Sequence, residues 1–123
     1  MPIPSYTILY VADPQTSARF YTDLLEIEPV ESSGTFALFV LPHGHKLGLW
    51  SCHTVAPETD VTGGGCELAF PLDSPEAVDA LYATWSEKAI PLAMAPTDLD
   101  FGRSFVALDP DGHRLRPMAV FVE

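Results

Sequence analysis

Positive charge is scarce in this chain. Its 123 residues include 6 Lys and Arg against 17 Asp and Glu, which gives a formal net charge of −11. A field of that sign repels the phosphates of nucleic acids and of anionic membranes. We therefore expect neither nucleic acid nor a membrane among the partners of this protein.

Long apolar runs and cysteines are also few. No segment approaches the roughly 20 apolar residues of a membrane-spanning helix, and the N-terminal residues lack the basic-then-apolar order of a secretion signal. These features favour a cytoplasmic protein. In that compartment we expect the two cysteines, Cys52 and Cys66, to be buried or half-buried free thiols rather than a disulfide.

Apolar residues are plentiful enough for one compact domain. They make up 47% of the composition, and a chain of this length can bury a sizeable core. We expect a single domain over residues 1–123.

A pattern of residues occurs twice within that domain. Residues 11–14 and 20–21 match residues 71–75 and 81–82, so that Pro14 aligns with Pro75 and Tyr21 with Tyr82. A Pro-x-Gly turn at residues 42–44 is likewise matched by one at residues 110–112. We expect two similar modules, about 1–55 and 66–123, joined by a Gly- and Pro-containing linker at about 56–65.

Each module has the periodicity of a strand, a helix and three further strands. Asp13-Pro14 and Ser74-Pro75 are typical helix starts, with a side-chain cap before a proline in the first turn. The first module is predicted to contain strands at 6–11, near 29–32, at 35–41 and at 46–52, with its helix between Pro14 and Pro29. The second is predicted to contain strands at 66–72, 90–95, 103–108 and 114–120, with a helical stripe of Val78, Leu81, Tyr82 and Trp85. Because Pro117 has no N–H, the last strand is expected to lose its pairing at that residue.

Equivalent positions of the two modules carry different chemistry. Tyr6 aligns with Glu67, and Gly48 aligns with Arg116. Because equivalent strands of a two-module fold are expected to line one cleft, these four residues are candidates for the functional site. Alternation places Gly48 and Trp50 on one face of their strand, shared with Tyr6, Ile8 and Tyr10.

The chain resembles the glyoxalase, bleomycin-resistance and extradiol-dioxygenase superfamily. The resemblance is carried by the paired modules, by Phe20-Tyr21, and by Phe101-Gly102-Arg103-Ser104-Phe105 leading to Asp109-Pro110-Asp111-Gly112-His113. It implies an α+β protein with the vicinal oxygen chelate fold, in which two βαβββ modules form curled mixed sheets around a cleft. Enzymes of that superfamily hold a divalent metal in this cleft with His, Gln or Glu ligands.

The four positions that correspond to the metal ligands are Tyr6, Gly48, Glu67 and Arg116. Glycine has no side-chain donor, and a guanidinium repels a cation. We therefore expect no metal and no other cofactor. An ion pair between Arg116 and Glu67 is expected instead.

Three further segments, Glu28-Pro29-Val30, Leu49-Trp50-Ser51 and Phe101-Gly102-Arg103, narrow the resemblance within the superfamily. They resemble phenazine-antibiotic resistance proteins, which bind a planar drug without altering it. It implies a homodimer in which the residue at Trp50 stacks on the ligand ring. The residues expected to form the ligand site are Trp50, Tyr6, Tyr10, Phe39, Gly48, Glu67, Phe101, Phe105 and Arg116.

Three alternative functions fit the same residues. One is a metal-dependent lyase or dioxygenase, and a second is a metal-free acid/base catalyst that uses Glu67 and Tyr6. The second is disfavoured because a neighbouring Arg116 would lower the pKa of Glu67. The third is a carrier or immunity partner in a biosynthetic pathway.

Overall fold

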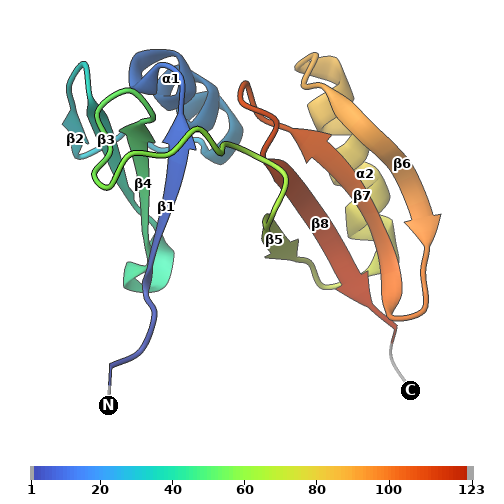
Figure 1. The fold of residues 1–123 in the computed structure, drawn as a ribbon. Helices are drawn as coiled ribbons and strands as arrows, with labels where there is room; N and C mark the ends of the chain where they lie inside the picture. Colours follow the sequence, from blue (N-terminus) through green and yellow to red (C-terminus); the bar gives the residue numbers. More distant parts are fainter. Residues whose placement is uncertain (1, 122–123) are drawn as a thin grey trace. The chain divides into compact units, whose positions relative to one another are not determined.

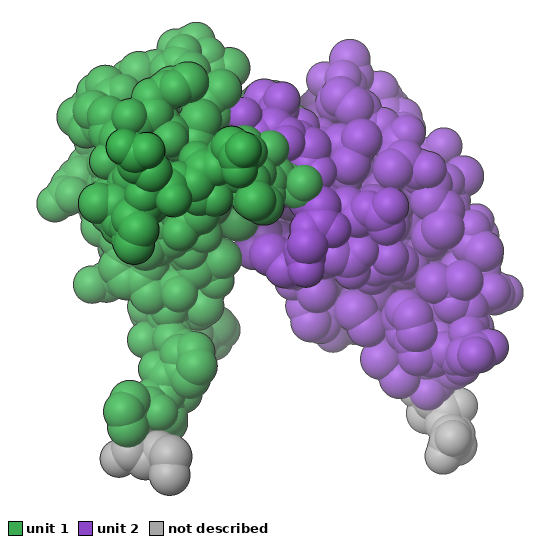
Figure 2. All heavy atoms as spheres, in the orientation of Figure 1, with its two compact units in different colours: residues 1–63 green, residues 64–123 purple. Residues whose placement is uncertain are grey.

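The chain forms two compact units that repeat one architecture. A computed structural model describes residues 2–121, and the units comprise residues 1–63 and residues 64–123 (Figures 1 and 2). The boundary between them falls inside the segment expected as a linker. Each unit contains one four-stranded mixed sheet and one long helix, which confirms the α+β class.

The first unit orders its strands β1-β4-β3-β2. Strand β1 is parallel to β4, whereas β3 is antiparallel to both β4 and β2. A short 3-10 turn, η1 (Pro42–Gly44), joins β3 to β4. The elements are β1 (Tyr6–Val11), α1 (Pro14–Leu25), β2 (Glu31–Ser32), β3 (Phe36–Val40) and β4 (Lys46–Ser51).

Local sequence explains the bounds of α1. The Asp13 side chain accepts a hydrogen bond from the Gln15 N–H, and Pro14 occupies the first turn. The helix ends at Glu26, which adopts a left-handed conformation with φ 59°. Tyr21 is fully buried from α1 against the sheet and makes an edge contact with Phe39. The helix therefore covers one face of the sheet and leaves the other face open (Figure 1).

The second unit repeats this order as β5-β8-β7-β6. Its elements are β5 (Glu67–Pro71), α2 (Pro75–Glu87), β6 (Leu92–Asp98), β7 (Gly102–Leu108) and β8 (Arg114–Val120). The Ser74 side chain caps α2 by accepting from the Ala77 N–H. The two sheets pair equivalent residues in the same way. In the first sheet Tyr6 lies opposite Lys46 and Ile8 opposite Gly48. In the second sheet Glu67 lies opposite Arg114 and Ala69 opposite Arg116. The expected internal repeat is confirmed.

The core of the second unit is an aromatic cluster under α2. Trp85 is 3% exposed and makes edge contacts with Phe70 and Phe105, whose ring centroids lie 5.6 and 5.4 Å away. Tyr82 contacts Phe105 at 5.3 Å. The helical stripe read from the sequence is therefore the face of α2 that packs on the sheet.

The expectation for Pro117 is confirmed on one side of β8. The ladder with β7 includes Ala107 opposite Leu115 and resumes with Ser104 opposite Met118, with no pair at Pro117. On the other side the pairing with β5 is kept, with Phe70 opposite Pro117, and β8 runs on to Val120. The expectation for the cysteines needs correction in one respect. Both cysteines are free thiols as expected, but Cys66 is exposed because it precedes β5.

Candidate functional site

The open face of the first sheet carries an apolar hollow of about 440 Å³. It is lined by Tyr6 and Ile8 from β1, Phe36 from β3 and Trp50 from β4. Tyr6 and Ile8 lie on the edge strand β1 and are 43% and 44% exposed, although both are large hydrophobic side chains. A concave, aromatic-lined surface of this size is typical of a small-molecule site.

Gly48 is buried beneath two of the rings that line this hollow. It lies opposite Ile8 on β1 and Leu38 on β3, and two residues from Trp50 on β4. A Cβ atom added to Gly48 would lie 2.9 Å from Phe36 Cζ and 3.1 Å from Tyr6 Cε1. The absent side chain therefore lets these two rings lie over the backbone of β4, where both line the hollow.

Trp50 stands at one end of the hollow. It is half-buried, and its ring meets Phe36 edge-on, with centroids 6.3 Å apart and planes at 83°. Tyr10 lies opposite Trp50 on the same face, at the end of β1. The expected sharing of one face by Tyr6, Ile8, Tyr10, Gly48 and Trp50 is confirmed.

Phe36 was missed by the sequence analysis, which selected Phe39 instead. Phe39 is fully buried and contacts Tyr21 of α1, so it belongs to the opposite face. The register of the β3–β4 hairpin identifies Phe36. Val40 lies opposite Lys46, and every second residue of β3 counted back from Val40 lies on the same face, which includes Phe36. The assignment of Phe39 to the ligand wall is therefore wrong.

The assignment of Phe105 is wrong for the same physical reason. Phe105 is fully buried in the aromatic cluster under α2. Its neighbour on β7, Ser104, points to the other face, where its hydroxyl accepts a hydrogen bond from Arg116 Nη1 at 3.0 Å. A side chain on the helix-covered face cannot also line the open one.

The open face of the second sheet is charged where that of the first is aromatic. Arg116 donates from Nε and Nη2 to the two oxygens of Glu67, at 2.7 and 2.9 Å. Arg114 adds a longer contact of 3.9 Å to the same carboxylate. The expected ion pair is confirmed, and its bidentate geometry fixes both side chains.

This pairing shifts the titration of both groups. The hydrogen bond from Arg116 lowers the pKa of Glu67, against a smaller opposing effect of burial. The hydrogen bond to Glu67 raises the pKa of Arg116. Glu67 is thus held as a carboxylate, which makes it a weak base and disfavours acid/base catalysis by this residue.

Glu67→Gln is expected to lower the free energy of unfolding at neutral pH by about 1 kcal/mol, the upper end for a partly exposed pair. Because the folded pKa of Glu67 lies below its unfolded value of about 4.3, its contribution is complete above that pH. It is lost as the pH falls through the folded pKa. In urea unfolding, the free energies of unfolding of wild type and variant should therefore converge in acid.

The control is Glu87→Gln, an exposed change of the same type at the end of α2. A difference in the free energy of unfolding between wild type and Glu67→Gln that does not depend on pH would contradict the assignment.

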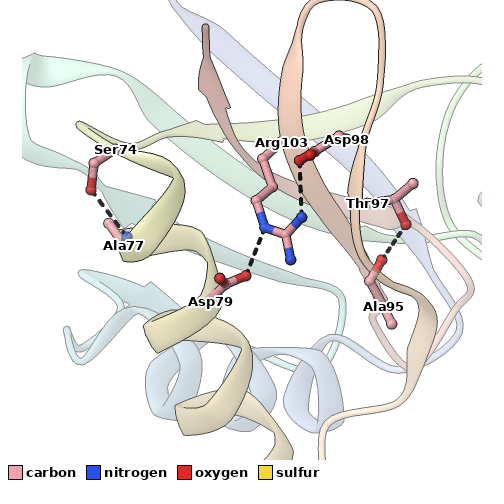
Figure 3. A network of polar contacts seen from close by, with 7 residues as sticks. All are labelled: Ser74, Ala77, Asp79, Ala95, Thr97, Asp98 and Arg103. Atoms are coloured by element: carbon pink, nitrogen blue, oxygen red, sulfur yellow. Dashed lines mark hydrogen bonds and ion pairs between the residues drawn. The ribbon is translucent and has the colours of Figure 1, made fainter.

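The segment of residues 101–103 is tied into the fold. The Phe101 carbonyl accepts a hydrogen bond from the Phe121 N–H, and the Phe101 side chain is 40% exposed. Arg103 is the second residue of β7, and its side chain donates to Asp98 of β6 and to Asp79 of α2, each at 2.9 Å (Figure 3). These two hydrogen bonds raise the pKa of Arg103. Arg103 therefore fastens α2 to its sheet.

The residues at the four ligand positions do not fit a divalent metal. Glu67 is the one carboxylate among them, and both of its oxygens are bound by Arg116. Gly48 offers no donor atom, and the Arg116 charge repels a cation. Among residues 2–121, no group of three or more His, Cys, Asp or Glu side chains is placed to hold a metal ion. No step through a metal follows from this chemistry.

The remaining residues expected at the ligand site are divided between the two units. The first unit contains Tyr6, Tyr10, Gly48 and Trp50, and the second contains Glu67, Phe101 and Arg116. The convergence of the two open faces on one cleft stays a prediction.

Within the described residues, no helix is long and apolar enough to cross a bilayer.

Comparison with known proteins places this architecture in a family. The chain is 29% identical over 117 residues to the phenazine antibiotic resistance protein EhpR of Enterobacter agglomerans, which covers 92% of this chain and 88% of that protein. It is 51% identical to protein ATC0852 of Agrobacterium tumefaciens, whose solution structure aligns over 99% of this chain and 100% of that one with a TM-score of 0.88.

A glyoxalase/bleomycin resistance protein/dioxygenase from Nocardioides has the same fold. It is 24% identical, with a TM-score of 0.83 over 98% of this chain and 85% of that one. A family profile described as the Glyoxalase/Bleomycin resistance protein/Dioxygenase superfamily matches residues 3–116. The chain therefore belongs to the glyoxalase/bleomycin resistance protein/dioxygenase superfamily.

Proposed function

We propose that this protein binds a planar aromatic small molecule, such as a phenazine-like antibiotic, and sequesters it without chemical change. The observation that carries the proposal is the aromatic hollow of Tyr6, Ile8, Phe36 and Trp50 above Gly48. Stacking on an aromatic side chain contributes about 1 kcal/mol beyond the burial of apolar area. The similarity to EhpR, a phenazine antibiotic resistance protein, supports this choice of ligand class.

A binding role without catalysis fits the charged residues. Glu67 is neutralised by Arg116, which leaves neither a metal-binding carboxylate nor an effective general base at the ligand positions. Resistance would then come from lowering the concentration of free drug. A homodimer, which the resemblance implies, and a cytoplasmic location are parts of the proposal; size-exclusion chromatography with light scattering tests the dimer.

A tryptophan-fluorescence titration with phenazine-1-carboxylate tests the proposal. Trp50 borders the hollow, whereas Trp85 is 3% exposed in the core under α2 and supplies a constant background. Saturable quenching at micromolar ligand is expected in wild type and should disappear in Trp50→Phe. The inner-filter effect is corrected with free tryptophan. Absence of saturable quenching with phenazines and other planar aromatics would reject the proposal.

A further inference from the structure

We propose that the hollow selects planar aromatic carboxylates and that the Lys46 ammonium group binds their anionic substituent. This inference rests on the proposed function and names the ligand class of the same site. It concerns a residue that lies beside the hollow and that no motif singles out.

Lys46 stands at the end of the hollow away from Trp50. It begins β4, four residues before Trp50 on the same face, which is about 13 Å at the usual rise of a strand. Its Nζ atom projects over the Tyr6 ring, 5.9 Å from the centroid. The ammonium is therefore held against a wall of the hollow, and a ring stacked on Trp50 could extend toward it.

The internal repeat shows what Lys46 lacks. Its counterpart in the second sheet is Arg114, which lies opposite Glu67 and contacts that carboxylate at 3.9 Å. Lys46 lies opposite Tyr6, which offers a ring in place of a carboxylate. Throughout residues 2–121, no carboxylate lies within ion-pair distance of Lys46. A carboxylate on the ligand would supply the missing anion.

The charges of the open face also orient such a ligand. Lys46 is the one lysine of the first unit and Arg19 its one arginine, and Arg19 lies on α1, which packs on the opposite face. Glu31 of β2 lies opposite Leu38 on the open face, two strands from β4 and thus about 10 Å away. An anionic group is repelled from the β2 edge and attracted to the Lys46 end.

The test compares phenazine-1-carboxylate with uncharged phenazine on wild type, Lys46→Met and Lys88→Met. Methionine keeps the apolar stem over Tyr6 and removes the charge. Wild type should bind the carboxylate about fivefold more tightly than phenazine, as expected for one partly exposed charge-assisted contact. The ratio should fall to about one in Lys46→Met and with added salt. Lys88→Met, the other lysine of the chain and located at the end of α2, should keep the wild-type ratio.

The outcomes separate this inference from the proposed function. Equal affinity of wild type for both compounds, with loss of both in Trp50→Phe, would overturn the role of Lys46 and leave aromatic binding intact. A carboxylate preference that persists in Lys46→Met would overturn it as well. Failure of both compounds to bind wild type would reject the proposed function and the inference together.

Discussion

Gly102→Ala is expected to destabilise the protein by about 3 kcal/mol or more. Gly102 is buried where β7 begins, opposite Val120 of β8. An added Cβ would overlap the Ala119 carbonyl oxygen and lie 2.8 Å from both Ala119 C and Val120 Cα. These are backbone atoms, so no change of side-chain rotamer relieves the clash and the two strands must separate. Circular dichroism should show a melting temperature lower by roughly 10 °C or more.

The matched control is Gly65→Ala in the same unit. A Cβ there meets nothing within 4 Å, so its effect on the free energy of unfolding should stay within about 0.5 kcal/mol. Equal melting temperatures for the two variants would show that β7 and β8 do not approach each other as closely as described.

The contacts of Gly102 explain part of the Phe101-Gly102-Arg103 segment. The sequence resemblance treats this segment as a mark of drug-binding proteins, yet its contacts are structural. Gly102 permits the close approach of β7 and β8, and Arg103 fastens α2 through Asp79 and Asp98. Only the half-exposed Phe101 ring is free of such a role among the three. Retention of this motif therefore reports on the fold more than on the ligand.

Much of the fold could be predicted because it is specified locally. Asp13 and Ser74 carry the capping oxygens that start the helices, and β1 has the predicted bounds Tyr6–Val11. The repeat fixed the equivalence of Tyr6 with Glu67 and of Gly48 with Arg116, which the register of the two sheets confirms. Local chemistry, however, does not determine which residues of different strands lie opposite each other.

The site was predicted less well because its members depend on that pairing. Trp50, Gly48 and Tyr6 follow from alternation along β1 and β4, but Phe36 is brought to them only by the antiparallel pairing of β3 with β4. A bulky apolar residue such as Phe39 reads the same in sequence whether it faces the helix or the ligand. The two faces differ by one residue of register, and a slip of one exchanges them.

Phe105→Ala is expected to lower the free energy of unfolding by about 3–5 kcal/mol. Phe105 is fully buried, and its ring is held edge-on by Tyr82 and Trp85, with centroids 5.3 and 5.4 Å away. Truncation leaves a cavity beneath α2, because two large rings cannot close it without leaving their own contacts. Urea unfolding followed by the fluorescence of Trp85 measures this loss directly.

The same position separates a core residue from a ligand residue. Phe105→Leu keeps most of the volume and should cost about 1.5 kcal/mol at most, so that the variant stays folded for titration with phenazine-1-carboxylate. Its affinity should equal that of wild type, because the ring lies on the helix-covered face of its sheet. Trp50→Phe should show the opposite behaviour, with stability nearly kept and saturable quenching lost. A stable, folded Phe105→Leu with weakened affinity would return Phe105 to the ligand site and require the open face of the second sheet to be reassigned.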